Sequence, residues 1–314
     1  MTVTAADLVL PAEPPAHGYL ITHDRCLDGA TAGVVAEAAG LFPVFVEPDG
    51  APAALEAFRQ RGWTGPLYLA DVSVPEALFP AWQDAISRIL DHHQTALPLS
   101  RYPRVTVDLH RSGAHLWYDF CVERGWLAAT PEWDRLVQEV ERYDLWQPGR
   151  GLGQDLNRLL RERGYNWYRT YYAHGWRPLT PELGDQLADL IRHEAEFVRA
   201  HLKRAQWWRA GSLTGAAVAL EDEGPVNEVA HRLLEAGADV VILLKPDGRL
   251  SARSNNRVNV AERMQAGFQG GGHARAAGGQ LPEGLSRSVE GAVEVLRRLL
   301  RDATGQEPQP ALLP

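Results

Sequence analysis

Residues 86–93 read Ile-Ser-Arg-Ile-Leu-Asp-His-His, a short apolar run that stops at one acid and two imidazoles. Residues 67–71, Leu-Tyr-Leu-Ala-Asp, have the same form. Such runs are typical of buried strands. Further strands are predicted at 19–22, 44–46 and 105–107, with helical patterns at 29–39 and 53–61 between them. Alternating strands and helices predict an α/β fold, with a parallel sheet covered by helices on both faces.

The second half of the chain has a different pattern. Residues 112–172 are helical in pattern, and 185–209 have the three-four apolar spacing of one long helix. A smaller α/β unit is then predicted, with strands at 215–220, 240–244 and 249–253 and helices at 226–236, 259–266 and 289–301. We therefore expect a loose N-terminal tail (1–17), a first domain (18–183), a linker helix (184–211), a second domain (212–303) and a loose C-terminal tail (304–314).

The composition excludes several classes of protein. With 32 Lys+Arg and 40 Asp+Glu the formal net charge is −8, which argues against binding along long nucleic acid. No apolar run is long enough to span a membrane, and the first residues do not form a signal-peptide pattern. Only Cys26 and Cys121 are present, so we expect no disulfide framework and a reducing, cytoplasmic location.

Polar residues gather where the predicted strands end, at the edge where open parallel sheets bind ligands. They are His23, Cys26, Asp28, Asp71, Asp91, His92 and His93, and Asp144 follows a helical stretch. A single strand-end Asp is usually a turn or helix cap, and a single His is usually a hydrogen-bonded core residue. Together they favour a site for divalent cations, because clustered carboxylates repel one another without a cation.

The sequence resembles the DHH phosphoesterase family, named for the triplet found here as Asp91-His92-His93. Four segments carry the resemblance in the first domain: His23–Gly29 (HDRCLDG), Asp71, Asp91–His93 and Glu141–Trp146 (ERYDLW). In the second, Gly270–Gly278 (GGGHARAAG) is similar to the glycine-histidine motif of the DHH-associated C-terminal domain. The resemblance spans about residues 18–280 in the family's order, and the oligoribonuclease (nanoRNase) members are the nearest in type.

The resemblance implies two divalent metal ions, which are expected to be Mn²⁺ as in the family. His23 and the position of Cys26 would hold the first ion, Asp28 and His92 the second, while Asp71 bridges them and Asp144 completes the cluster. Paired cations lower the pKa of a shared water, so that hydroxide is available to attack phosphorus. His93 would face the substrate phosphate as a catalytic residue, and Asp91 would orient its neighbours.

Cys26 departs from the family, which usually has Asp at this position. A thiolate is a softer ligand that suits Zn²⁺ or Fe²⁺ better than Mn²⁺. Three outcomes stay open: Cys26 binds the first metal, Asp24 or a water replaces it, or that metal site is weak. Some DHH-like sequences carry a Cys-x-Asp-Gly segment, so we interpret Cys26 as a ligand variant.

The second domain is expected to bind the substrate phosphate. Backbone N–H groups of glycines such as Gly271 and Gly272 can surround an anionic oxygen, and His273 adds a donor. Arg253 and Ser254 end a predicted strand, where Arg253 could make a bidentate phosphate contact. The alternative is a glycine-rich turn beside a surface arginine.

Two shorter features have open interpretations. Arg111–Ala114 begins a predicted helix whose first amides could meet a phosphate, unless Ser112 is simply the cap. Residues 158–176 mix arginines with aromatic residues, which suits base stacking, the core or a homodimer contact.

These observations predict a hydrolase. A phosphate-binding site and a metal site facing each other across a cleft would select short substrates. We expect a phosphodiesterase that degrades short oligonucleotides (nanoRNA or short single-stranded DNA) or dinucleotides to mononucleotides. The alternatives are a cyclic-dinucleotide phosphodiesterase, a nucleoside 3',5'-bisphosphate phosphatase, a single-strand exonuclease and, from another class, a non-catalytic nucleotide-binding regulator.

Overall fold

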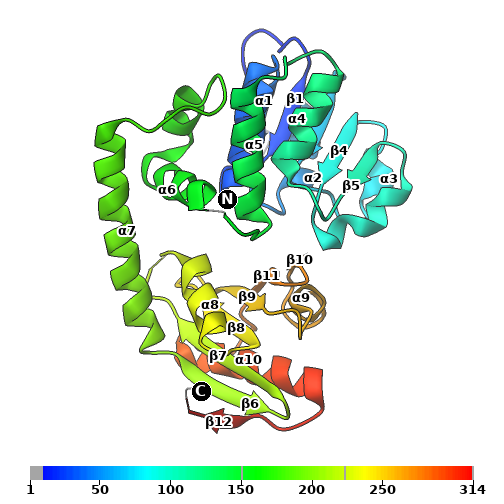
Figure 1. Ribbon diagram of the computed structural model, residues 1–314. Helices are drawn as coiled ribbons and strands as arrows, with labels where there is room; N and C mark the ends of the chain where they lie inside the picture. The colour runs from blue at the N-terminus through cyan, green and yellow to red at the C-terminus, as the bar shows by residue number, and fades with distance from the viewer. Residues whose placement is uncertain (1–9, 150, 223, 313–314) are drawn as a thin grey trace. The chain divides into compact units, whose positions relative to one another are not determined.

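The computed structural model describes residues 10–149, 151–222 and 224–312 (Figure 1). The chain divides into two compact units, residues 1–187 and 188–314. The fold is α/β in both. The expected N-terminal tail lies mostly outside the described residues. No helix among the described residues is long and apolar enough to cross a membrane.

The first unit contains a five-stranded parallel sheet of order β2-β1-β3-β4-β5. Its strands are β1 (Tyr19–Thr22), β2 (Phe42–Phe45), β3 (Leu67–Ala70), β4 (Arg88–Asp91) and β5 (Val105–Val107). From β1, the chain goes to β2 on one side and later returns as β3 on the other. The carboxyl ends of β1 and β3 therefore form the switch point at which such sheets bind ligands.

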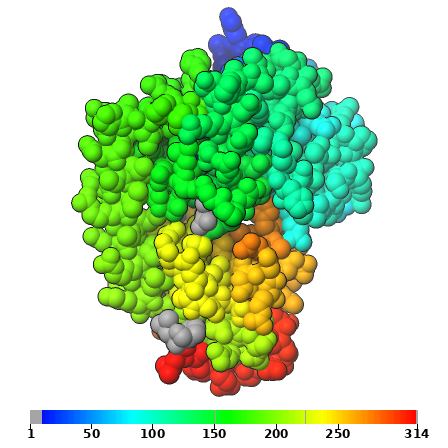
Figure 2. Space-filling model, in the orientation of Figure 1, coloured from blue at the N-terminus to red at the C-terminus, as the bar shows by residue number. Residues whose placement is uncertain are grey.

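Helices cover both faces of this sheet, as the alternating pattern predicted. They are α1 (Leu27–Ala38), α2 (Ala51–Gln60), α3 (Phe79–Trp82), the 3₁₀ helix η1 (Gln94–Arg101), α4 (Gly113–Glu123), α5 (Pro131–Asp144) and α6 (Gly151–Tyr171). Leu20 of β1 faces one core with Trp117 of α4, while Ile21 faces another with Phe58 of α2. In the space-filling view, green segments form much of the surface of this unit on the side shown, with cyan segments at one edge (Figure 2).

The aromatic segment at 158–176 contributes to the core of the first unit. Tyr168 and Tyr172 are fully buried there, and Trp167 packs against them. Of the three interpretations of this segment (base stacking, the core or a homodimer contact), packing in the core describes Tyr168 and Tyr172.

The long helix is shorter than the sequence predicted. α7 (Pro181–Leu202) ends before Lys203, and residues 206–210 form strand β6 instead of the end of the helix. Trp208 fits the apolar pattern of the predicted helix, but Trp207 and Trp208 alternate across a strand, with Trp207 buried. Pairing of β6 with two neighbouring strands outweighs the helical pattern.

The second unit has a seven-stranded mixed sheet of order β10-β11-β9-β8-β7-β6-β12. The strands are β6 (Gln206–Ala210), β7 (Leu213–Ala219), β8 (Val240–Leu244), β9 (Arg249–Ser254), β10 (Gly271–His273), β11 (Ala276–Gln280) and β12 (Gln309–Ala311). Its helices are α8 (Val226–Glu235), α9 (Val260–Gly267) and α10 (Val289–Thr304). Alternate residues of β8 face two different cores, with Ile242 on the α10 side and Leu243 on the α8 side.

The C-terminal segment 304–314 was expected to be loose, and the structure differs here too. Residues 309–311 form β12, which pairs with β6, and Glu307 forms ion pairs with Arg297 and Arg301. Prolines weakened the strand signal in this segment, but an edge strand tolerates proline.

Candidate metal centre

The ends of three strands in the first unit supply the centre of the site. His23 follows β1, Asp71 follows β3, and β4 ends at Asp91, just before His92. Because these are neighbouring strands of one parallel sheet, their carboxyl ends meet at the same edge. Helix α1 begins at this edge with Asp28 in its first turn, and α5 ends nearby at Asp144.

A first ligand group contains His23, Cys26 and one oxygen of Asp71. His23 Nε2 lies 2.9 Å from Asp71 Oδ2, and Cys26 Sγ lies 3.4 Å from the same oxygen. The sulfur and the imidazole nitrogen are 3.6 Å apart. Three donor atoms of this kind can bind one divalent cation.

A second ligand group contains Asp28, His92 and Asp144. His92 Nε2 lies 3.6 Å from Asp28 Oδ2, and His92 Nδ1 lies 3.5 Å from Asp144 Oδ2. The other oxygen of Asp71, Oδ1, is 3.0 Å from His92 Nε2. The two oxygens of Asp71 therefore face different ligand groups.

Burial and mutual repulsion disfavour the charged form of several of these acids. Burial raises the pKa of Asp28 well above its usual range, and the charges of Asp71 and Asp144 raise it further. Burial also raises the pKa of Asp144, although His92 opposes the effect. A bound cation would favour the charged carboxylates that the protein alone disfavours.

The imidazoles offset this repulsion at Asp71. Burial alone would raise the pKa of Asp71, but His23 and His92 hold it well below the usual range. Burial lowers the pKa of His92, yet Asp144 and Asp71 raise it well above the usual value. Without a cation, a proton on His92 therefore helps to compensate the carboxylates.

The backbone of Asp71 is in the left-handed region, with φ = 60°. Among non-glycine residues, Asp and Asn adopt this conformation most readily. The chain thus turns sharply at the end of β3, and both carboxylate oxygens are held near the two ligand groups.

Cys26 is also the N-cap of α1, because its sulfur accepts a hydrogen bond from Gly29 N at 3.3 Å. Burial raises the pKa of the Cys26 thiol well above its ordinary value, and Asp71 and Asp28 raise it further. Asp24, the alternative ligand, is exposed and belongs to none of the ligand groups formed by the described residues.

Asp91 orients the segment that follows it. Its Oδ1 accepts hydrogen bonds from His92 N at 2.7 Å and from His93 Nδ1 at 2.7 Å. Ser73 donates to the other oxygen. The side chain of His93 is about one-third exposed, so part of it is accessible. Sequence reasoning missed Ser73, whose only signal was its place two residues after Asp71.

Helix α4 touches the centre in a way that the sequence did not predict. Gly113 N donates to Asp28 Oδ2 at 2.7 Å, and Ala114 N donates to Asp28 Oδ1 at 3.0 Å. Ser112 is the N-cap, accepting from His115 N. The first amides of this helix therefore meet a carboxylate of the protein, where the sequence suggested a phosphate.

In the second unit, Arg253 is fixed by its neighbours on β9 and α8. It donates to Ser251 Oγ at 2.9 Å and to Asn227 Oδ1 at 2.5 Å. Arg253, Ala276 and His273 are register partners across three adjacent strands. Directly opposed residues share one face of a sheet, so Arg253 and His273 lie on the same face with a small alanine between them.

The other predicted phosphate-binding residues have different roles. Ser254 is buried and donates to Val258 O at 2.6 Å, so its hydroxyl stabilises a turn and does not point to solvent. Gly271 and Gly272 lie in the edge strand β10. Gly272 has φ = 136°, a backbone conformation that favours glycine.

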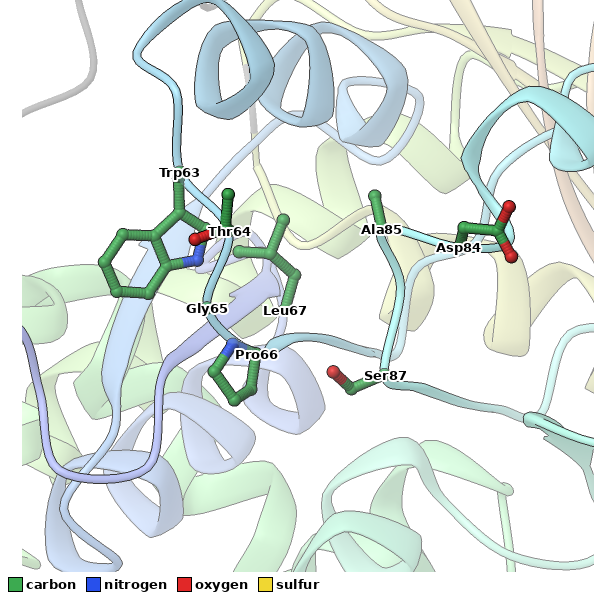
Figure 3. Close-up of a pocket in the computed structure, with 8 residues that line it drawn as sticks. All are labelled: Trp63, Thr64, Gly65, Pro66, Leu67, Asp84, Ala85 and Ser87. Carbon is green, nitrogen blue, oxygen red and sulfur yellow. The ribbon is translucent and has the colours of Figure 1, made fainter.

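A pocket lies elsewhere in the first unit (Figure 3). It is lined by Trp63, Thr64, Gly65, Pro66, Leu67, Asp84, Ala85 and Ser87. These residues are at the amino ends of β3 and β4, whereas Asp71 and Asp91 lie at the carboxyl ends. The pocket is thus separate from the metal centre.

The comparisons with known proteins agree with this fold. Residues 212–302 match the DHHA1 domain family. A search of the curated proteins finds no match for the sequence. Among solved structures, exonuclease RecJ bound to manganese is 16% identical with a TM-score of 0.55, covering 91% of this chain and 89% of that chain.

Two further structures are similar. RecJ in complex with Mn²⁺ from Thermus thermophilus is 18% identical with a TM-score of 0.53, covering 93% of this chain and 52% of that chain. The pGpG-specific phosphodiesterase PggH from Vibrio cholerae is 15% identical with a TM-score of 0.47, covering 92% of this chain and 98% of that chain. The chain thus shares the two-domain α/β fold of RecJ and has a second unit similar to the DHHA1 domain.

Proposed function

We propose that the protein is a DHH-type phosphoesterase that uses two divalent cations to hydrolyse phosphodiester bonds. One observation carries the proposal: Asp71 Oδ2 faces His23 and Cys26, while Asp71 Oδ1 faces His92. A carboxylate whose two oxygens serve two ligand groups fits a bridge between two cations. The match of residues 212–302 to the DHHA1 domain and the RecJ-like fold support this assignment.

The ligand roles follow from the distances. His23 and Cys26 would hold the first cation, Asp28, His92 and Asp144 the second, and Asp71 both. When bound, the cation pair supplies hydroxide at neutral pH and compensates charge on the phosphoryl oxygens. We propose Mn²⁺, which is bound in RecJ structures of the same fold.

His93 is the proposed catalytic residue of the protein itself. Asp91 accepts a hydrogen bond from Nδ1, which orients the ring so that the imidazole can donate to a phosphoryl or leaving oxygen of the substrate. Asp91 also accepts from two backbone amides of the same segment, which limits movement of the imidazole. It is therefore a positioning residue.

In the second unit, we propose that Arg253 and His273 bind a substrate phosphate. They share one face of the sheet, and Ser251 and Asn227 hold the guanidinium in place. A fixed guanidinium with an imidazole on the same face suits an anionic oxygen. Next to this pair, Gly271, Gly278 and Ser251 are register partners across the same three strands. This row therefore adds no bulky side chain beside Arg253 and His273.

We propose short oligonucleotides as substrates, with mononucleotides as products. The net charge of −8 disfavours the many phosphate contacts that binding to long nucleic acid requires. A few fixed donors, such as Arg253, are enough for a short anionic substrate.

A substrate panel tests this function. RNA and DNA of increasing length from the dinucleotide, cyclic dinucleotides and nucleoside 3',5'-bisphosphates are incubated with the protein and Mn²⁺. Asp71→Asn removes the bridge, and Asp49→Asn, at an exposed position, is the matched control. We expect turnover that falls with substrate length, is lost in Asp71→Asn and is unchanged in Asp49→Asn.

The other outcomes separate the alternatives. Preference for cyclic dinucleotides or for bisphosphates would identify a different substrate for the same metal-dependent hydrolysis. Equal rates at all lengths would favour an exonuclease. Tight nucleotide binding without turnover under any divalent cation would overturn the proposal in favour of a regulator.

A further inference from the structure

The amino terminus of α4 holds both oxygens of one proposed ligand. Gly113 N and Ala114 N donate to Asp28 Oδ2 and Oδ1 at 2.7 and 3.0 Å. With both oxygens bound, the carboxylate of Asp28 cannot rotate freely about its terminal bond. The positive end of the helix also favours the charged carboxylate.

The same glycine packs directly against a second proposed ligand. A Cβ built on Gly113 would lie 2.6 Å from Asp71 Cβ and 2.9 Å from Asp71 Cα. Real Cβ atoms do not approach other carbons so closely, and these neighbours belong to the backbone or the first side-chain carbon of Asp71. Any side chain at position 113 must therefore displace Asp71, α4 or both.

Helix α4 is in turn attached to the helix that carries the third carboxylate. Glu141 of α5 accepts hydrogen bonds from Ser112 N at 3.0 Å and from His115 Nδ1 at 2.9 Å. Glu141 is three residues before Asp144, so the two are about one helical turn apart. The start of α4 thus contacts Asp28, Asp71 and the helix of Asp144.

We propose that Gly113 is a positioning residue, which sets the separation of Asp28 and Asp71 and thereby the affinity for the two cations. This inference rests on the proposed function. The amide of Gly113 orients Asp28, and its lack of a side chain allows the backbone of Asp71 to lie close. Neighbours that orient metal ligands typically change metal affinity or activity by about 10- to 100-fold when altered.

Gly113→Ala tests the inference, with Gly184→Ala as the control. Gly184 also lies in a helix, and a Cβ there would meet no atom within 4 Å. Alanine favours helices more than glycine does, so helix propensity alone would stabilise both variants. Three quantities are measured in each: the Mn²⁺ dissociation constant by calorimetry, the unfolding temperature of the metal-free protein, and kcat and KM with a dinucleotide.

We expect Gly113→Ala to bind Mn²⁺ about 10- to 100-fold more weakly and to lose kcat at a fixed Mn²⁺ concentration, with little change in KM. Gly184→Ala should match the wild type in Mn²⁺ affinity and in both kinetic constants. A residue with only a structural role would change the unfolding temperature of the metal-free protein and leave the Mn²⁺ affinity of the folded fraction unaltered.

Unchanged Mn²⁺ affinity in folded Gly113→Ala would overturn the inference and leave the proposed function standing. Absence of divalent-cation binding in the wild type would overturn both. If Gly113→Ala does not fold, Glu141→Gln replaces it, because this change loosens α4 without adding atoms. Mn²⁺ binding several-fold weaker than in the wild type then supports the inference, and wild-type affinity refutes it.

Discussion

The two units treat buried acids in opposite ways. In the second unit, Asp239 is surrounded by donors of the protein, accepting from Thr214 N at 2.8 Å, from Asn255 Nδ2 at 2.9 Å and from the Arg257 guanidinium at 3.0 Å. In the first unit, Asp28, Asp71 and Asp144 lie together, and among the described residues no arginine or lysine forms an ion pair with any of them.

The pKa shifts reflect this difference. Burial would raise the pKa of Asp239, but Thr214 N, Asn255 and Arg257 lower it below its usual range. For Asp28 and Asp144, burial and neighbouring carboxylates raise the pKa instead. The second unit pairs its acid with Arg257, whereas among the described residues the acids of the first unit are paired with imidazoles and with no arginine or lysine. The comparison therefore favours an external cation in the first unit.

The largest expected effect is at Asp71. Asp71→Asn keeps a residue that tolerates φ = 60° but removes the negative charge shared by both ligand groups. We expect turnover to fall by about 10³-fold. Dinucleotide hydrolysis with Mn²⁺ measures it, and calorimetry should show loss of cation binding. Near-normal turnover would mean that Asp71 is not needed to bind a cation. The contrast drawn between the acids of the two units would then fail.

The next effect is at His93, which contacts Asp91 without being a proposed ligand. His93→Gln should lower kcat by about 10²-fold, because the group that donates to the substrate is lost. The Mn²⁺ affinity should stay within a few-fold of the wild type. If this variant loses Mn²⁺ affinity, His93 is itself a metal ligand and must be added to the ligand groups of the first unit.

Position 26 tests how selective the first metal site is between different cations. Cys26→Asp replaces a soft ligand by a hard one, so we expect the preference for Mn²⁺ over Zn²⁺ to rise by about tenfold. Competition between the two metals, followed by calorimetry, measures the ratio. An unchanged ratio would show that the sulfur acts only as the N-cap of α1.

The smallest effect is expected at Asp239 and concerns stability. Asp239→Asn should lower the free energy of unfolding at pH 7 by about 1–3 kcal/mol, since hydrogen bonds to a charged group are lost. The folded-state pKa of Asp239 is lowered, so its contribution is present above the unfolded value and fades as pH falls through the folded one.

Thermal unfolding of both proteins as pH is lowered from 7 to about 3 should therefore show the difference shrinking below about pH 4. Mn²⁺ binding should be unaffected in Asp239→Asn. A stability difference that grows on acidification would contradict the assignment of Arg257 as the partner of a charged Asp239.

Residues at strand ends could be located from the sequence. Apolar runs mark where the strands end, and in a parallel sheet the carboxyl ends of the strands lie at one edge. This is why His23, Asp71 and the Asp91–His93 triplet could be placed at one edge before the structure was known. Asp144 ends a helix and follows no strand, so the sheet did not place it, and its role as a ligand depended on the family resemblance.

The contacts of Gly113 could not be predicted in this way. It is 85 positions from Asp28, and its second contribution is the absence of a side chain, which leaves no pattern in a sequence. The end of the long helix could not be predicted for a different reason. Trp208 fits the helical apolar pattern, whereas pairing with the neighbouring strands β7 and β12 selects a strand there.

The left-handed turn at Asp71 limits the mutational routes open to this centre. Glutamate, the simplest replacement that keeps a carboxylate, would have to adopt a conformation that favours Gly, Asp, Asn or His. Cys26, in an extended conformation with φ = −130°, has no such restriction. Evolution or a designer seeking another metal would therefore find more residue types compatible with the backbone at position 26 than at position 71.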